Sequence, residues 1–278
     1  MVKPHPRIIR PLFAHTDKML IHKNLNKFRP LAVLVAIFLS WILLSGFASA
    51  PVINWGLKPN ERELTPTVST AGRELLEKYN GLYVARGAAN GDKKYYLTFD
   101  LGYESGNTAA VLDILKEHNL KAIFFLCGNY LKETELVNRM LAEGHTLGNH
   151  TNRHKNLPKL SEEGIRKDIS VLAEDFAEKY LDAKPMAFFR PPEGSFDERT
   201  LKIAQEYGLR TMMWSIAIVD WGKKPINAGN SSDKIAKRIH PGAIILSHIA
   251  NSGTPEMLKL LIPALAEKGY TCGTPDEL

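Results

Sequence analysis

Two periodicities alternate along the chain beyond residue 94. Short apolar runs rich in β-branched and aromatic residues, such as YYLTFD, are typical of buried strands, and between them apolar residues recur at amphipathic helical spacing. The expected strands are residues 95–100, 121–127, 145–150, 186–191, 209–217, 242–248 and 270–274. The helical patterns between them are NTAAVLDILKEHN, LKETELVNRMLAEG, SEEGIRKDISVLAEDFAEKY, DERTLKIAQEYG and TPEMLKLLIPALAEKG. This alternation predicts a parallel sheet covered by helices.

Seven parallel strands in this length of chain fit two folds. They can form an open doubly wound sheet or an incomplete barrel of strands and helices. In both folds ligands bind at the carboxyl-terminal ends of the strands. Reactive residues should therefore lie at those ends if they form one site.

The pattern before residue 51 is different. Residues 31–50, LAVLVAIFLSWILLSGFASA, contain no charged side chain and are long enough to span a bilayer as a helix. Residues 1–30 contain seven Lys or Arg and one acid, Asp17, so this segment predicts a cytoplasmic N-terminus and an extracytoplasmic remainder. Small residues near Ala48 equally fit cleavage of a signal peptide, so a retained anchor and a removed signal both stay open.

The expected organisation is therefore fourfold. A polar stretch with two prolines, KPNERELTPTVST, precedes a short helical pattern, TAGRELLEKYNGLYV, and predicts an arm on the domain surface. The predicted parts are a basic segment at 1–30, an anchor or signal at 31–50, an arm with a short helix at 51–92 and the main domain at 93–275.

Charge and cysteine content exclude some functions. The basic segment alone accounts for the net charge of +6, so the rest of the chain is neutral and nucleic acid is not an expected partner. The two cysteines allow one disulfide, but Cys127 lies in the apolar run KAIFFLCG, which favours a buried free thiol over pairing with Cys272.

Polar side chains follow several of the expected strands. The first strand ends in Asp100, which could cap a helix that begins near Asn107 or could take part in chemistry. The third leads into GNHTNRHKN, where His150 and His154 have a spacing that places two imidazoles on one side of a helical turn, within reach of one metal ion.

Three further strands continue this pattern. The fourth ends at Arg190, and the stiff proline pair that follows either holds the backbone N–H of Glu193 toward a ligand or forms an ordinary surface turn. The fifth runs into Asp220 and Trp221, and the sixth finishes at His248. Because one edge of a parallel sheet collects all of these side chains, we expect a single catalytic site there.

Several segments resemble the polysaccharide deacetylases with a NodB-homology domain, the family 4 carbohydrate esterases. The segments are NWGLKP, LLEKYNGLYV, YLTFDLGYESG, FFLCGNYLK, EGHTLGNHTNRH, FRPPEGSFDERTL, WSIAIVDW and GAIILSH. Among these enzymes the chain most resembles the N-acetylmuramic acid deacetylases that form muramic δ-lactam in spore cortex peptidoglycan. The resemblance implies a distorted or incomplete (β/α) barrel of about seven parallel strands.

The resemblance also implies a metal-dependent hydrolase. A divalent metal, most often zinc, would be held by His150 and His154, and Asp100 would be the base that deprotonates water. Arg190 would orient that base. The positive charge of Arg190 would also favour the ionised form of Asp100 at neutral pH.

The remaining family roles fall on five positions. The N–H of Glu193 would stabilise the oxyanion, and His248 would protonate the departing amine with Asp220 as its partner. Trp221 and Leu246 would form the walls of the acetyl pocket.

One position departs from the family pattern. Leu101 lies where most members have a second Asp that binds the metal, and an aliphatic side chain cannot be a ligand. The spore-type muramic acid deacetylases also lack this acid and share the Gly102-Tyr103-Glu104 sequence, so the departure favours that subfamily. Glu104 is an alternative ligand.

The expected activity is removal of N-acetyl groups from N-acetylmuramic acid in peptidoglycan glycan strands, after an N-acetylmuramoyl-L-alanine amidase has removed the peptide stems. An N-acetylglucosamine or chitooligosaccharide deacetylase is the first alternative. An inactive, membrane-tethered module that binds cell wall is the second. The enzyme would act outside the cytoplasm, in the cell envelope or spore cortex.

Overall fold

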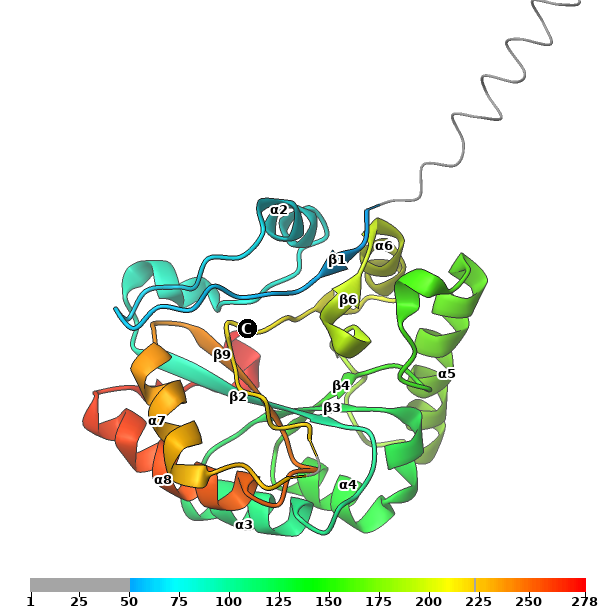
Figure 1. The fold of residues 1–278 in the computed structure, drawn as a ribbon. Coiled ribbons are helices and arrows are strands. Elements are labelled where there is room, and N and C mark those ends of the chain that lie inside the picture. Colours follow the sequence, from blue (N-terminus) through cyan, green and yellow to red (C-terminus); the bar gives the residue numbers. More distant parts are fainter. Residues whose placement is uncertain (1–50, 223) are drawn as a thin grey trace, which may run out of the picture. The chain divides into compact units, whose positions relative to one another are not determined.

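A curved sheet of parallel strands runs through the chain (Figure 1). This computed structural model describes residues 51–222 and 224–278. The path of the sheet is β7 (Arg210–Thr211), β5 (Phe188–Phe189), β4 (Thr146–Asn149), β3 (Ile123–Leu126), β2 (Lys94–Leu101), β9 (Ala243–His248) and β8 (Ile216–Ala217). A further strand, β10 (Thr271–Cys272), pairs in parallel with the beginning of β2. The prediction of a parallel sheet is confirmed.

The sheet curls because its two outer strands, β7 and β8, are joined by only four residues. The segment 209–217, predicted as one strand, is instead two strands at opposite ends of the path. The backbone explains the break: Met212 donates to Phe189 of β5 at 2.8 Å, whereas Ser215 donates to Ile244 of β9 at 3.0 Å. The chain thus crosses from one edge of the sheet to the other, which makes the fold a distorted (β/α) barrel and excludes an open doubly wound sheet.

Helices cover the outside of this sheet (Figure 1). They are α3 (Thr108–Glu117), α4 (Thr134–Ala142), α5 (Glu162–Lys179), α6 (Glu198–Glu206), α7 (Ala228–Arg238) and α8 (Thr254–Glu267). All were predicted except α7. Side chains alternate along β2, so that Leu97, Phe99 and Leu101 belong to the main apolar cluster with these helices. Thr98 and Asp100 therefore face the interior of the barrel.

The N-terminal arm packs on the barrel. Its strand β1 (Ile53–Asn54) pairs with β6 (Ser195–Phe196), and the Trp55 indole donates to the Trp214 carbonyl at 3.0 Å. The predicted short helix is α2 (Thr70–Lys78), capped by the Ser69 hydroxyl. Short 3-10 turns complete the chain: η1 (Arg86–Asn90), η2 (Gly128–Lys132), η3 (Leu157–Lys159), η4 (Pro192–Gly194) and η5 (Pro275–Glu277).

The predictions for residues 1–30 and 31–50 lie outside the described residues. Within residues 51–222 and 224–278, no helix has both the length and the apolar character needed to cross a membrane. Cys127 and Cys272 are both free thiols, and burial raises the pKa of Cys127 to about 12. Cys127 is therefore a packed, unreactive side chain at neutral pH.

Candidate active site

Asp100 and His248 lie side by side at the ends of neighbouring strands. They are register partners of β2 and β9, and the preceding pairs, from Tyr95 with Ala243 onward, fix that alignment. On the other side of β2, strand β3 leads to β4, whose end carries His150. The strand ends thus bring the predicted base, the predicted acid and one predicted ligand to one edge of the sheet.

Arg190 is the organising cation of this edge. Its side chain is 0% exposed and its Nη1 donates to Asp100 Oδ1 at 2.7 Å. The other nitrogens donate to Thr98 Oγ1 at 3.0 Å and to the Met212 carbonyl at 3.0 Å, and the guanidinium lies 4.0 Å from the centre of the Phe125 ring. A planar group held at three points has one available orientation, so Asp100 is fixed as well.

These surroundings decide the protonation of Asp100. Burial alone would raise the pKa of this carboxyl. The Arg190 guanidinium outweighs burial, helped by His150 and His248, and the pKa is lowered. Asp100 is therefore an ionised carboxylate at neutral pH, as a base must be before it accepts a proton.

The two predicted metal ligands lie on a loop, and the expected helical turn is absent at these residues. Thr151 and His154 have positive φ angles of 67° and 53°, and the Thr151 hydroxyl accepts the His154 N–H at 3.1 Å. This irregular turn still brings the rings of His150 and His154 to a centroid distance of 4.9 Å. The spacing thus predicted that the two rings lie close together, but the local structure that brings them together is a loop and not a helical turn.

His150 is held as a neutral imidazole. Its Nδ1 lies 2.8 Å from the Arg190 carbonyl oxygen, to which it can only donate, and its Nε2 lies 3.4 Å from Asp100 Oδ2. Burial lowers the pKa of His150 to about 4. Its Nε2 consequently carries a lone pair directed toward the strand ends, while His154 is exposed beside it.

His248 is fixed by a different partner. Its Nδ1 lies 2.7 Å from Asp220 Oδ1, and its backbone N–H donates to Asp220 Oδ2 at 2.8 Å. Ser247 donates to the same oxygen at 2.6 Å. Burial lowers the pKa of His248, but the Asp220 hydrogen bond and the charges of Asp100 and Asp220 outweigh it, and the pKa is raised. Asp220 thereby favours the protonated form of His248.

The carboxylate of Glu104 has a structural role. It accepts hydrogen bonds from the Gly106 N–H, from the Thr108 hydroxyl and, at 2.6 Å, from the Tyr130 hydroxyl. These contacts place it over the first turn of α3, where a negative charge is stabilised by the helix dipole. Glu104, and not Asp100, is therefore the acid that caps this helix, and its oxygens are already occupied.

The donor set for a metal is correspondingly small. Leu101 is buried in the main apolar cluster and supplies no ligand. No group of three or more His, Cys, Asp or Glu side chains in the described part of the chain is arranged to hold a metal ion. The pair of His150 and His154, with His150 Nε2 left unprotonated by its tautomer, nevertheless suits a divalent cation that prefers nitrogen.

Three other predicted positions surround these groups. Glu193 has a φ of 60° in the turn after the two prolines, and its carboxylate accepts from Asn156 Nδ2 at 2.7 Å. Leu246 is buried two residues before His248, hence on the same face of β9. Trp221 follows Asp220 but its side chain is 71% exposed. The structure therefore places Leu246 beside the site and directs Trp221 toward solvent.

Two residues that support the site were missed from the sequence. Thr98 accepts from Arg190 and donates to the Ile245 carbonyl at 2.8 Å, and Ser247 holds Asp220. Thr98 could have been found, because strand alternation places it on the same face as Asp100. Ser247 precedes His248 and carried no comparable signal.

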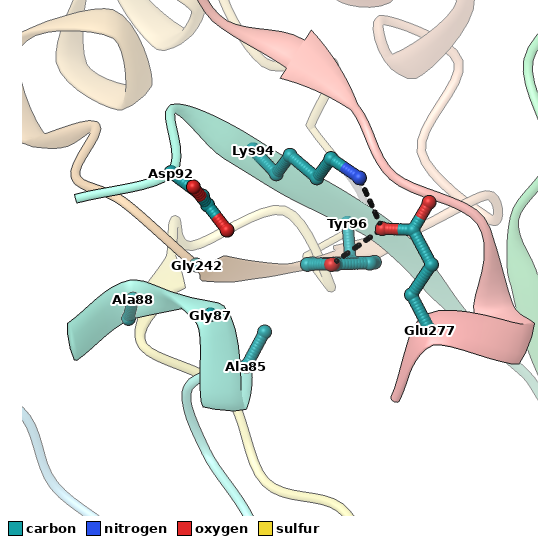
Figure 2. Close-up of a pocket in the computed structure, with 8 residues that line it drawn as sticks. All are labelled: Ala85, Gly87, Ala88, Asp92, Lys94, Tyr96, Gly242 and Glu277. Carbon is teal, nitrogen blue, oxygen red and sulfur yellow. Dashed lines mark hydrogen bonds and ion pairs between the residues drawn. The ribbon is translucent and has the colours of Figure 1, made fainter. Parts of the chain in front are cut away.

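A separate cavity of about 220 Å³ lies at the opposite end of β2 (Figure 2). Glu277 there accepts from Lys94 Nζ at 2.7 Å and from the Tyr96 hydroxyl at 3.1 Å. The lining of this cavity contains no histidine and none of the predicted site residues. The predicted site residues therefore lie at the carboxyl-terminal strand ends and not in this cavity.

Comparison with known proteins gives consistent results. The family model described as polysaccharide deacetylase matches residues 87–212. The peptidoglycan N-acetylmuramic acid deacetylase PdaA of Bacillus subtilis is 36% identical over 81% of this chain and 85% of its own length. The solved structure of PdaA, a family 4 carbohydrate esterase, aligns with a TM-score of 0.75 at 35% identity, covering 82% of this chain and 96% of that one.

Two other relatives differ in their stated properties. A peptidoglycan N-acetylglucosamine deacetylase of Bacillus cereus is 37% identical over 70% of each chain. A protein of Bacillus anthracis described as a family 4 carbohydrate esterase pseudoenzyme aligns with a TM-score of 0.65 at 30% identity, covering 71% of this chain and 68% of that one. The relatives thus span two amino-sugar specificities and one protein without activity.

Proposed function

The chain belongs to the polysaccharide deacetylase family, the family 4 carbohydrate esterases, and from that membership we propose that it removes N-acetyl groups from peptidoglycan. The observation that carries this proposal is that Asp100, paired with the buried Arg190, and His248, paired with Asp220, lie side by side at adjacent strand ends. Asp100 is held ionised and His248 is favoured in its protonated form. Hydrolysis of an amide needs both a base for water and an acid for the amine.

In this proposal Asp100 accepts a proton from the attacking water while Arg190 keeps the carboxylate in place. His248 then donates a proton to the departing nitrogen through Nε2, because its Nδ1 is engaged by Asp220. The Glu193 N–H lies in the rigid turn after Arg190 and donates to the oxyanion. Leu246 lines the pocket for the acetyl methyl group, with Trp221 as its second, solvent-exposed wall.

His150 and His154 are the residues that would hold the divalent metal, zinc by their nitrogen donors. When bound, such an ion polarises the acetyl carbonyl and lowers the pKa of water. A pair of protein ligands binds more weakly than the three typical of catalytic zinc, so the affinity should be low.

The finer substrate assignment is N-acetylmuramic acid, in the formation of muramic δ-lactam in spore cortex. It is supported by the printed activity of PdaA and by the Leu101 departure together with Gly102-Tyr103-Glu104. N-acetylglucosamine is the competing substrate, supported by the Bacillus cereus relative. We further propose that the chain acts outside the cytoplasm through residues 31–50, after an amidase has cleared the peptide stems.

A second candidate function is a wall-binding module without activity. Leu101 supplies no metal ligand, and a relative of the same fold is described as a pseudoenzyme. Against this, a binding module needs neither the buried Asp100–Arg190 pair nor the Asp220–His248 pair. Buried charges are costly, so their presence together supports catalysis.

Acetate release tests these alternatives. The full-length chain is incubated with amidase-treated peptidoglycan and with N-acetylglucosamine oligomers, each with added zinc and with chelator. Release from the treated peptidoglycan alone is expected, and chelator should abolish it. Release chiefly from the oligomers would transfer the substrate assignment to N-acetylglucosamine. No release under any condition would favour the module without activity.

A further inference from the structure

One residue of helix α5 holds the middle of the loop that carries the two predicted metal ligands. This loop, residues 150–154, follows β4, and we call it the histidine loop. The Asp168 backbone carbonyl accepts the Asn152 N–H at 2.7 Å, and the Asp168 carboxylate accepts from Arg153 Nε, also at 2.7 Å. Both contacts fall between the two histidines in the sequence, so α5 limits how the loop between them can move.

The backbone of the histidine loop has a conformation that needs such support. Thr151 is β-branched and has a φ of 67°, and His154 has a φ of 53°, a region that residues other than glycine seldom adopt. Conformations of this kind persist only where the surrounding structure fixes them. The Gly128 N–H supplies a second support, since it lies 3.2 Å from the carbonyl oxygens of both Thr151 and Asn152. The loop is therefore held from two segments at once.

The two histidines are not held equally. His150 follows β4 directly, its side chain is buried, and its Nδ1 donates to the Arg190 carbonyl at 2.8 Å. His154 is exposed, and the hydrogen bond that its backbone N–H donates to the Thr151 hydroxyl is the one that fixes it. The anchored side chain of the preceding residue, Arg153, is consequently the contact with α5 that lies nearest to His154 along the chain.

The carboxylate of Asp168 is costly to the fold. Its side chain is 0% exposed, whereas that of Arg153 is 51% exposed. Its Oδ2 has no hydrogen-bond partner within residues 51–222 and 224–278. A buried carboxylate with one oxygen unused is destabilising, and an apolar side chain would often be at least as stable in its place. The contact with the histidine loop therefore accounts for this residue better than a contribution to stability does.

We propose that Asp168 and Arg153 are positioning residues that hold His154 beside His150 before a divalent cation binds. Because this pair of imidazoles supplies few ligands, the affinity depends strongly on how little conformational freedom the loop still has to lose. Residues that orient metal-binding histidines typically control affinity without contacting the ion. The inference rests on the proposed function for the metal, and it goes beyond it by assigning a role to the α5 residue beneath the loop.

Zinc binding to the full-length chain is measured by calorimetry, with no glycan present. Arg153→Met removes the ion pair from the loop, and Asp168→Asn removes it from the helix while keeping the buried volume. Each variant should weaken the zinc Kd about tenfold, and circular dichroism verifies that each is folded. Arg166→Met is the matched control, because Arg166 also belongs to α5 but pairs with Glu206 of α6. The zinc Kd of this control should be unchanged.

A His154→Ala background supplies a measurement that a merely structural role would not change. The zinc Kd of His154→Ala is compared with that of His154→Ala combined with Arg153→Met. The second substitution should cause no further loss, because the histidine that Arg153 positions is already absent.

Four outcomes would overturn the positioning role: zinc Kd values of the folded variants within about twofold of the unaltered chain, an equal loss in the Arg166 control, a full further loss in the His154 background, or no zinc binding by the unaltered chain. Acetate release by the unaltered chain is measured separately. Zinc binding that depends on Arg153 without any acetate release would overturn the proposed deacetylation and leave the positioning role intact. Acetate release together with a zinc Kd that Arg153→Met does not change would do the reverse.

Discussion

The two ends of strand β2 each carry a carboxylate paired with a cation, in opposite surroundings. At the amino end, Lys94 and Glu277 are 2.7 Å apart with side chains 42% and 36% exposed. At the carboxyl end, Arg190 and Asp100 are also 2.7 Å apart, but 0% and 7% exposed. The contact distance is the same, and only the access of water differs.

This difference separates an ordinary surface ion pair from the pair to which we assign a role in the proposed reaction. Solvent screens the Lys94–Glu277 pair, so it contributes little to folding. The Arg190–Asp100 pair has lost its hydration, and an apolar pair of equal volume would often be at least as stable. We therefore propose that this buried pair is kept for its charge, which with the neighbouring His248 serves the proposed reaction.

Asp100 gives the most direct test of the difference between the two ion pairs. Asp100→Asn keeps the shape and one acceptor for Arg190 but removes the proton acceptor, so acetate release should fall by at least about a thousandfold. Glu277→Gln, the matched change at the other end of β2, should retain full activity. Rates are measured on amidase-treated peptidoglycan, with circular dichroism to verify folding. Activity in Asp100→Asn near that of the parent would exclude this residue as the base.

A variant of Arg190 tests the same difference through the free energy of unfolding. Arg190→Met leaves a buried carboxylate without its cation and should lower the free energy of unfolding by about 3 to 5 kcal/mol. The measurement is urea denaturation followed by fluorescence. Adding Asp100→Asn to Arg190→Met should restore part of the loss, because the uncompensated charge is removed. A double variant no more stable than Arg190→Met would show that packing, not charge, holds Arg190.

A variant of Asp220 tests whether His248 is the acid in the proposed reaction. The pKa of Asp100 lies below its ordinary value and that of His248 above 6.5, so kcat/KM should be maximal between them and fall as His248 loses its proton. Asp220→Asn removes the bond and charge that raise the pKa of His248. The alkaline limb should then move to lower pH, with kcat/KM about tenfold to a hundredfold lower. An unmoved limb would remove His248 from the role of acid.

The fold could be predicted from periodicity because strands buried on both faces give continuous apolar runs. The break within 209–217 could not, since Met212 and Met213 are as apolar as a strand interior. Only the change of backbone partner, from Phe189 at Met212 to Ile244 at Ser215, marks it. Helix α7 was missed because it buries serines, Ser231 and Ser232, where a predictable helix buries leucines. Hydrophobic periodicity reflects which residues are buried and not directly which element they form. In both cases the pattern of apolar residues did not correspond to the observed element.

The candidate site was predictable only in part for a similar reason. Strand ends identified Asp100, Arg190, Asp220 and His248, because parallel strands collect their last residues at one edge. The conformation of the loop with His150 and His154 depends on positive φ angles at non-glycine residues, which spacing does not encode. The capping role of Glu104 depends on Tyr130, which lies 26 residues away.

Glu104 gives the smallest expected effect and distinguishes the two carboxylates that follow β2. Glu104→Gln keeps the volume but weakens bonds to the first turn of α3, so unfolding should become easier by about 1 kcal/mol. Because the Glu104 carboxylate is occupied by Gly106, Thr108 and Tyr130, kcat at saturating glycan should be unchanged. Thermal unfolding and steady-state acetate release measure the two effects. A loss of kcat comparable to that of Asp100→Asn would instead make Glu104 a catalytic residue or metal ligand.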